Sequence, residues 1–520
     1  MLVSLNNILN NKSLSYIWFI FFLYSVLISF VVQLIILPYF VPFLHSGNGQ
    51  LVGGDWANYQ ARAVFEFNKI NELGWEAWQL RPSGWGMTGL ISAIYSLFGS
   101  TKPYLLIPLY SLLHSIGALC IVMLIEKLGV SRFIAFVSAL PYLLFPTSLL
   151  WLTQILKDVF TLNGSLLILY GLVMIFGLKR VNLSRKFLIH STLSLMCIFI
   201  GIIVTWLVRP YMVSIFSIFI IFVFAFLNLF LVIEIINDKK FQLKIIALLT
   251  IQIIVFSLVY FLPNSAVLGV PALGSQSSFI DSTDNSLSEQ NIVFSDKNNQ
   301  DIDIVSKENQ DIDIVSKENQ DIVIARQKIN PNGLNSNSLG VEIEQNKTKA
   351  IKSYPKWEKT KFLPTQIDYY LSKLYSNRVY FNKVNENANT SIYGEKHLNS
   401  LRNMILFIPK AAQISFFAPF PSSWFADHPS SMSKILHKIS GFEMALIYIS
   451  LIGTFFSIAI WRQKIELWIM ISFSLYFGIV YSLALPNIGT LIRYRYSAIM
   501  ILVALGLAAA FHLFLTKKRK

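Results

Sequence analysis

Two carboxylates stand at points in this 520-residue chain where an apolar segment meets polar sequence. Asp55 lies in the run Gly53–Tyr59, soon after the first apolar segment, and Asp158 follows Lys157 at the start of another. Asp55 is able to cap the helix expected after it, and Asp158 to stabilise a helix N-terminus while Lys157 extends toward lipid headgroups. A chemical role at a membrane boundary is the other interpretation, and the residues alone leave both open.

Cationic side chains occur at the same predicted boundary. Arg209 precedes Pro210, and Arg493 and Arg495 flank Tyr494 ahead of the last apolar segment. A guanidinium group at such a boundary grips a phosphate through two parallel hydrogen bonds, and a lipid headgroup is the plain alternative for any one arginine. Several cations beside two carboxylates favour one shared site.

The composition excludes an ordinary soluble enzyme and a disordered protein. Hydrophobic residues make up 54% of the chain and charged residues only 14%, against roughly a quarter charged in soluble domains. The net charge of +15 comes from basic clusters between apolar runs, which is typical of polytopic membrane proteins. Cys120 and Cys197 both lie inside apolar runs and indicate neither a disulfide framework nor a zinc site.

Ten segments are apolar and long enough to span a bilayer, for which about 20 residues are needed. They cover 15–37, 103–126, 132–152, 159–178, 187–207, 211–233, 243–262, 441–461, 466–485 and 496–515. The predicted fold is therefore all-α, a polytopic membrane helix bundle of about ten transmembrane helices. If the spans alternate, the basic clusters share one side, and the positive-inside rule then places that side and both termini in the cytoplasm. These clusters are Lys127 with Arg132, Lys179 to Lys186, Lys239 to Lys244, Arg462 with Lys464, and Lys517 to Lys520.

Two long loops then face outward. The first covers 38–102 and carries Asp55; the second covers 263–440. They divide the chain into an N-terminal transmembrane module (1–262), the second loop, and C-terminal transmembrane helices (441–520). Every other connection is short, so extracytoplasmic chemistry must come from these loops and the outer helix ends.

Both loops show internal patterns. In the first, a helical stretch at 61–71 precedes an apolar stretch, Leu90–Phe98, which is too short to span and is expected to lie along the outer surface or to dip into it. The second contains a ten-residue sequence repeated in tandem over Gln300–Asn319, within a stretch (about 275–346) predicted to be disordered. Its aromatic-rich part, 354–381, is expected to fold against the membrane surface.

The order and sidedness of these residues resemble those of the GT-C membrane glycosyltransferases, which include protein O-mannosyltransferases and lipid A aminoarabinose transferases. The resemblance covers about 15–178. It is carried by Asp55 soon after the first span, by the following Tyr59, and by Lys157 and Asp158 at the outer start of the fourth span.

The chain also departs from that pattern. Trp56 follows Asp55 where those enzymes often have a second acid, and Arg81-Pro82-Ser83 stands where His-Pro-Pro or Lys-Pro is common. The last spans match weakly, through Arg493-Tyr494-Arg495. These departures leave the subfamily and the sugar open.

The resemblance implies an integral membrane glycosyltransferase that moves a sugar from a polyprenyl-phosphate donor to a glycan, lipid or protein acceptor on the extracytoplasmic face, with inversion. Asp55 is then expected to act as the general base. Arg493 and Arg495 are the first candidates to hold the leaving phosphate, and Arg209 and Lys157 are the second.

Three further residues complete the expected substrate-binding set. Asp158 is expected to orient Lys157 or to help bind the acceptor or a divalent cation, and Tyr59 and Arg81 belong to the set through the resemblance. A metal is a possible cofactor but not an obligatory one, and no metal ligands are assigned. No nucleic-acid partner is expected, and the expected location is a bacterial inner membrane.

Two other functions fit parts of the pattern. A polytopic transporter or lipid-linked sugar flippase would also have many spans, but it would place its charges near the bilayer midplane. A protein like the O-antigen polymerases and ligases would also grip lipid-linked sugars through arginines. The position of Asp55 so soon after the first span favours the transferase.

Overall fold

The fold is known from a computed structural model. It describes residues 9–179, 183–238, 243–264, 354–384, 392, 397–425 and 431–517. The stretch 275–346 with its repeat, for which disorder was predicted, lies outside these residues.

Helices dominate the described chain. They are α2 (Leu14–Val31), α3 (Asp55–Leu73), α4 (Gly86–Phe98), α5 (Ile107–Glu126), α6 (Arg132–Leu144), α7 (Pro146–Thr153), α8 (Asp158–Leu178), α9 (Arg185–Val208), α10 (Pro210–Asp238), α11 (Leu243–Asn264), α13 (Thr365–Val384), α14 (Leu401–Phe417), α15 (Ser431–Trp461), α16 (Ile465–Ala484) and α17 (Ile488–Lys517). A π-helical segment, Val32–Phe40, extends α2, and the short strands β1 (His45–Gly47) and β2 (Gln50–Leu51) pair antiparallel.

The all-α polytopic bundle predicted from the sequence is confirmed, whereas the number of spans differs. Among the described residues, eight helices are long and apolar enough to cross a membrane: α2 with its π-helical extension, α5, α8, α9, α10, α15, α16 and α17. A ninth span results if α6 and α7 are taken together. The remaining predicted span, 243–262, corresponds to α11, whose apolar described part, Leu243–Val259, is shorter than the other spans.

The predicted span 132–152 is broken in the structure. Its two halves, α6 and α7, meet at an angle of 64°. Pro146 is the first residue of α7, and the residue before it, Phe145, is extended (φ −66°, ψ 137°). Because a proline ring disfavours helical backbone in the residue that precedes it, the helix ends at this point and restarts in a new direction.

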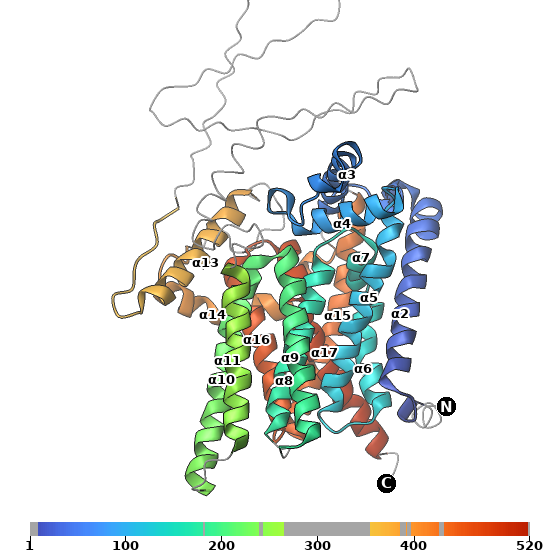
Figure 1. Cartoon of the computed structure of the whole chain (residues 1–520). Helices are drawn as coiled ribbons and strands as arrows, with labels where there is room; N and C mark the ends of the chain where they lie inside the picture. Colours follow the sequence, from blue (N-terminus) through green and yellow to red (C-terminus); the bar gives the residue numbers. More distant parts are fainter. Residues whose placement is uncertain are drawn as a thin grey trace, which may run out of the picture. The chain divides into compact units, whose positions relative to one another are not determined.

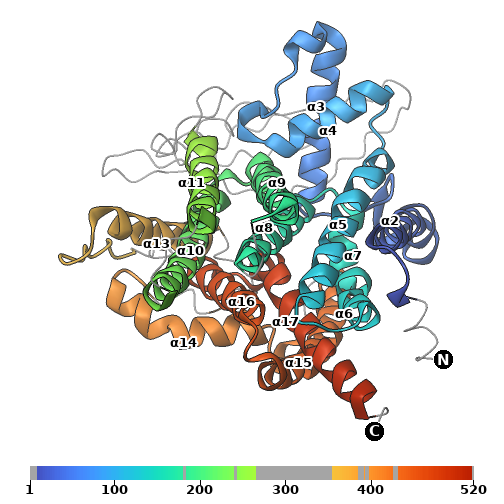
Figure 2. The same ribbon diagram turned by 60° about the horizontal axis from the view of Figure 1, so that its bottom comes forward.

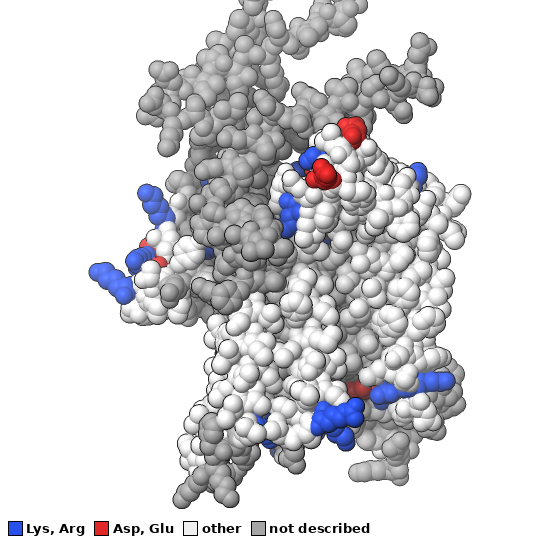
Figure 3. All heavy atoms as spheres, in the orientation of Figure 1, with Lys and Arg blue, Asp and Glu red and all other residues white. Residues whose placement is uncertain are grey.

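The spans run side by side, with α3 and α4 together at one end of the bundle and both chain termini at the other (Figure 1). On the face drawn in Figure 3, charged side chains gather near these two ends, and the belt between them is made of other residues. Large apolar side chains such as Phe19, Leu27 and Phe222 are more than half exposed on the outer helices. An exposed apolar belt of this kind fits lipid, so the protein is an integral membrane protein.

Helix α8 forms the centre of the bundle. Its apolar span is buried throughout, and it packs against α9, α5, α17 and α16 (Figure 2). Glycines allow the closest approach: a Cβ on Gly164 of α8 would lie 2.8 Å from the carbonyl oxygen of Gly201 on α9. Membrane helices commonly associate through small residues in this way. In lipid the hydrophobic effect does not drive helices together, so the van der Waals contact that small residues allow becomes important.

The part of the second loop nearest the C-terminal spans folds onto them. Helix α14 packs along α16, and α13 contacts the C-terminal end of α16. Arg378 of α13 is 2% exposed and donates to the carbonyl oxygens of Ser482 and Leu483, at 3.4 and 3.3 Å. A cation at a helix C-terminus meets unpaired carbonyl groups and the negative end of the helix dipole, so Arg378 attaches α13 to α16.

The contact between α15 and α17 provides a test of the close helix packing at glycines. A Cβ on Gly506 of α17 would lie 1.9 Å from the carbonyl oxygen of Ser450 on α15. We expect Gly506→Ala to force the helices apart and to destabilise the protein by about 1–3 kcal/mol. Thermal unfolding in detergent measures the change. Gly177→Ala is the matched control, since nothing lies within 4 Å of its added Cβ and alanine favours helix. Equal stability of the two variants would contradict the close packing.

Candidate functional site

Asp55 is the first residue of α3. The residue before it, Gly54, has φ 83°, a left-handed conformation that favours glycine, and Gly54 rather than Asp55 occupies the N-cap position. The Asp55 carboxylate instead accepts a hydrogen bond from Arg493 Nη1 of α17. Its side chain is 51% exposed and that of Arg493 31% exposed. The structure therefore joins the two through a partly exposed ion pair rather than using Asp55 as a helix cap.

Asp158 and Arg209 form a second, buried ion pair. Arg209 Nη2 lies 2.8 Å from Asp158 Oδ1, and the two side chains are 3% and 1% exposed. Arg209 Nη1 also donates to Thr161 Oγ1 at 3.1 Å. Pro210 disfavours helical backbone at Arg209, so α9 ends there and the guanidinium faces the N-terminus of α8. The N-terminus of α8 in turn favours a carboxylate at Asp158.

Tyr494 links this buried pair to α17. The Arg209 guanidinium lies over its ring, 4.1 Å from the centroid, and its hydroxyl shares a hydrogen bond with that of Tyr211. Tyr494 is the neighbour of Arg493 in the chain. Arg209 is therefore held by a carboxylate on one side and an aromatic face on another, which leaves it committed to contacts within the protein.

Lys157 is held by aromatic rings. Its ammonium lies 5.5 Å from the centroid of Tyr59 and 5.3 Å from that of Trp85. Within the described part of the chain, no carboxylate oxygen lies within ion-pair distance of it. Burial, followed by the Arg209 guanidinium, lowers the pKa of Lys157 to about 8, although Asp158 and Asp55 act in the opposite direction.

Tyr59 and Trp85 form the aromatic wall beside Lys157. Their rings meet edge to face with centroids 5.6 Å apart, and Tyr59 is 4% exposed. Burial raises the pKa of Tyr59, so its hydroxyl stays protonated. Tyr59 lies four residues after Asp55, on the same face of α3. Arg62, on the same helix, lies over Trp85 at 4.7 Å.

Arg81 attaches the first loop to α9. Its guanidinium donates to the carbonyl oxygens of Trp206 and Gly84, each at 3.0 Å, and lies over the Trp206 ring at 5.3 Å. Close by, a Cβ on Gly86 would lie 1.9 Å from the carbonyl oxygen of Leu207. Arg81 therefore positions the segment that carries Trp85, and its contacts are with backbone and ring rather than with the charged residues.

Arg495 points away from this group. It is 1% exposed, and its guanidinium donates to the carbonyl oxygens of Ile414, Ser415 and Ala418 at the C-terminal end of α14. The sequence predicts that Arg495 binds substrate beside Arg493. Because α17 begins at Ile488, both arginines are helical, and residues two apart on a helix point in nearly opposite directions. Arg495 thus caps a helix while Arg493 meets Asp55.

Five charged residues therefore form one group, hereafter the charge cluster: Asp55, Lys157, Asp158, Arg209 and Arg493. All five are predicted from the sequence, and they come from four segments of the chain. Trp85 and Tyr494 are not among the predicted site residues, although their rings hold Lys157 and Arg209. Trp85 follows Pro82-Ser83-Gly84, and Tyr494 lies between Arg493 and Arg495. An aromatic residue close to a cation at the predicted membrane boundary is therefore the sequence signal that could have indicated both.

The cluster has the groups for binding a phosphate and transferring a proton, but not a complete metal site. Among the described residues, no three or more His, Cys, Asp or Glu side chains come together as metal ligands. Asp55 and Asp158 each already accept from an arginine. The divalent cation that the sequence left possible therefore stays a prediction, without a group of three such ligands among the described residues.

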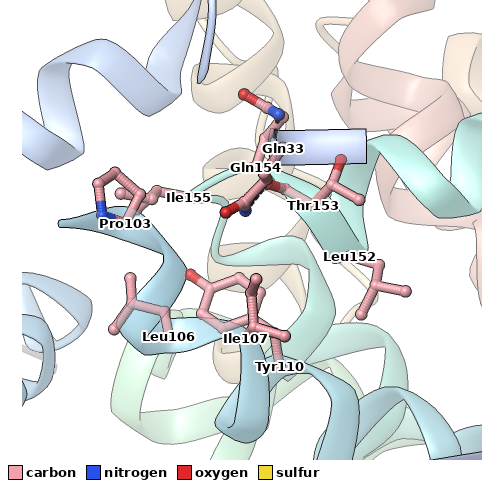
Figure 4. A pocket seen from close by; sticks show the side chains of 9 residues that line it. All are labelled: Gln33, Pro103, Leu106, Ile107, Tyr110, Leu152, Thr153, Gln154 and Ile155. Atoms are coloured by element: carbon pink, nitrogen blue, oxygen red, sulfur yellow. Dashed lines mark hydrogen bonds between the residues drawn. The ribbon is translucent and has the colours of Figure 1, made fainter. Parts of the chain in front are cut away.

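A small pocket lies next to the segment that leads into Lys157 (Figure 4). Its cavity volume is about 10 Å³, room for about one water molecule and far below the roughly 300 Å³ at which small-molecule sites begin. Gln33 of the π-helical segment donates to the carbonyl oxygen of Thr153 at 2.6 Å across it. The other lining residues are Pro103, Leu106, Ile107, Tyr110, Leu152, Gln154 and Ile155.

Comparison with known proteins adds no relative: no protein-family model, curated protein or solved structure matches this chain. The functional argument therefore depends on the chemistry of the cluster itself.

The buried pair gives a stability prediction. We expect Asp158→Asn and Arg209→Gln each to destabilise the protein by about 3–5 kcal/mol, because each leaves the partner's charge buried without compensation. The double variant should lose less than the sum of the two, since it removes both charges. Denaturant unfolding in detergent measures all three. Strictly additive losses would show that the two side chains do not stabilise each other.

Lys157 gives a pH prediction. Its ammonium is charged below its pKa of about 8 and neutral above it. We therefore expect affinity for a phosphate ester to fall by up to tenfold per pH unit above that value. The second phosphate pKa, near 6, does not interfere there. Titrations from pH 7 to 9.5 measure the slope, and Lys157→Arg should abolish it because arginine keeps its charge. An unchanged slope in Lys157→Arg would assign the effect to another group.

Proposed function

We propose that this protein is an integral membrane glycosyltransferase of the GT-C type, which moves a sugar from a polyprenyl-phosphate-linked donor to an acceptor hydroxyl. The observation that supports it most is the contact of Asp55 with Arg493 beside Lys157. It combines a partly exposed carboxylate with two cations at the end of the bundle where α3 lies. A proton acceptor and a phosphate grip are the two groups that this reaction requires.

The proposed reaction is a single displacement. The acceptor oxygen attacks the anomeric carbon of the donor while the Asp55 carboxylate takes the acceptor's proton. The bond between that carbon and the phosphate oxygen breaks, and its electron pair goes to the phosphate. The products are a glycoside of inverted configuration and a polyprenyl phosphate with one more negative charge.

Arg493 and Lys157 are the proposed phosphate grip. Arg493 is partly exposed, and its guanidinium suits two parallel hydrogen bonds to phosphate oxygens. Lys157 contributes a charge that the aromatic wall holds in place. Both cations are positioned before the leaving group gathers charge, so they stabilise the transition state without reorganising. Asp158 and Arg209 hold the segments that carry them.

The proposed sidedness follows from the charged loops. The connection between α5 and α6, which begins with Lys127 and leads into Arg132, lies at the end of the bundle opposite α3 and α4 (Figure 1). The positive-inside rule assigns that end to the cytoplasm and the charge cluster to the extracytoplasmic face. Nucleotide-linked sugars are made in the cytoplasm, so a lipid-linked donor suits this position. We propose a bacterial inner membrane as the location, with a glycan, lipid or protein as acceptor.

A transporter or flippase would need a different charge arrangement. Such proteins bind their cargo near the bilayer midplane, at interrupted helices. Here the cluster residues are at helix ends: Asp55 begins α3, Lys157 precedes α8, and Arg209 ends α9. This arrangement favours chemistry at one membrane surface over passage across it.

Asp55→Asn is the direct test of the transferase proposal. We expect it to reduce sugar transfer from a polyprenyl-phosphate donor by about 10²–10⁴-fold, because the amide cannot accept the proton. Thermal stability should change little, since the side chain is half exposed. Transfer to a mixture of acceptors in membranes that contain the purified protein provides the measurement.

Glu72→Gln is the control. Glu72 is an exposed acid near the other end of α3, so this variant removes the same charge without touching the cluster. It should keep full activity. Retained transfer in Asp55→Asn would remove Asp55 from the proposed mechanism.

A further inference from the structure

The two ion pairs of the charge cluster differ in how firmly they are made. Asp158 and Arg209 are almost fully buried, so separating them would leave two charges uncompensated in an apolar interior. Asp55 and Arg493 are about half and one third exposed. An exposed pair of this kind contributes only about 0–1 kcal/mol, because water solvates both partners when they part. The second pair is therefore the one that a ligand can separate.

The charges of the cluster are also unequal. Three cations, Lys157, Arg209 and Arg493, face two carboxylates. Asp158 compensates Arg209 and Asp55 compensates Arg493, which leaves Lys157 against aromatic rings. If the Asp55 carboxylate moved away from Arg493, three cations would face Asp158 alone, and the cluster would carry two positive charges in excess. That arrangement suits a phosphate group, which carries one to two negative charges.

The Asp55 carboxylate resembles a phosphate in what it offers Arg493. Each presents anionic oxygens to the same guanidinium donors, and Arg493 Nη1 already donates to Asp55 Oδ2. A phosphate that binds Arg493 through this edge must replace the carboxylate. We propose that Asp55 occupies the phosphate site of Arg493 in the empty protein and that an arriving phosphate displaces it.

This inference deepens the proposed function and takes from it the identity of the ligand as a polyprenyl phosphate. Its consequence is that binding of the donor phosphate and release of the Asp55 carboxylate from Arg493 occur together. Before the phosphate binds, Asp55 is engaged by Arg493. Afterwards its carboxylate faces the acceptor, so the proton acceptor becomes available only when a donor is present.

The test is a double-mutant cycle on phosphate binding in the full chain, purified in detergent. The variants are Asp55→Asn, Arg493→Ala and the two combined, and the ligand is a short-chain polyprenyl phosphate. We expect Asp55→Asn to bind it about two- to fivefold more tightly than the unaltered protein, because its competitor at Arg493 is gone. Arg493→Ala should bind it more weakly. In the Arg493→Ala background, Asp55→Asn should have no further effect.

Two outcomes would overturn the proposal. Unchanged or weaker binding by Asp55→Asn would show that the carboxylate does not occupy the phosphate site. Tighter binding that persists without Arg493 would show only long-range repulsion of the ligand. Glu72→Gln controls for loss of a charge from α3 and should leave binding unchanged, and thermal unfolding confirms that each variant is folded.

Parallel titrations identify the source of the phosphate. Coupling between Asp55 and Arg493 with the polyprenyl phosphate alone supports a lipid-linked ligand, and coupling with inorganic phosphate as well supports a site for the phosphate group itself. The uncharged polyprenyl alcohol should show no coupling. Sugar transfer is assayed separately. Coupled binding without transfer would contradict the transferase but not the displacement, and transfer without coupling would contradict the displacement alone.

Discussion

The arrangement of the charge cluster depends on the cost of burying a charge. Asp158 and Arg209 lie where the side chains are almost excluded from water, and each is stable there only because the other is present. Their pairing brings the N-terminus of α8 to the break between α9 and α10. The stacking of Arg209 on Tyr494 then adds α17. One buried pair thus joins three of the four segments that carry the cluster, including the part of α17 with Arg493.

Arginine serves two purposes in this protein, and burial separates them. Arg378 and Arg495 are almost fully buried and donate to carbonyl groups at the C-terminal ends of α16 and α14. There they satisfy backbone acceptors that lipid could not satisfy, which is a structural requirement for any helix that ends inside a membrane protein. Arg493 reaches only a partly exposed carboxylate. Within the charge cluster, Arg493 is therefore able to exchange its partner for a ligand.

The aromatic residues around the cluster have an electrostatic consequence. A cation held by a ring keeps its charge available to an anion, whereas a cation paired with a carboxylate does not. Lys157 is held by Tyr59 and Trp85, and burial is the main cause that lowers its pKa to about 8. Such a group stabilises negative charge strongly because little water screens it. The aromatic wall therefore maintains an anion site in the absence of a ligand.

The sequence by itself determined the class of fold and the places where chemistry could occur. Apolar length is a local property, so the spans were largely predictable, and the residues at their ends followed. The break at Pro146 is equally local, but the predicted span 132–152 rests on hydropathy, which does not detect the effect of a proline on the backbone.

Only the tertiary structure decided which charged residues meet. Arg493 and Arg495 are alike in sequence context, but α17 begins before both of them, so its turn sends one toward Asp55 and the other into α14. Trp85 and Tyr494 gained their roles in the same way, through packing between distant segments. An apolar span can be recognised from consecutive residues of the sequence. Which charged side chains form ion pairs depends instead on the rotation and burial of each helix, which are set when the helices pack together.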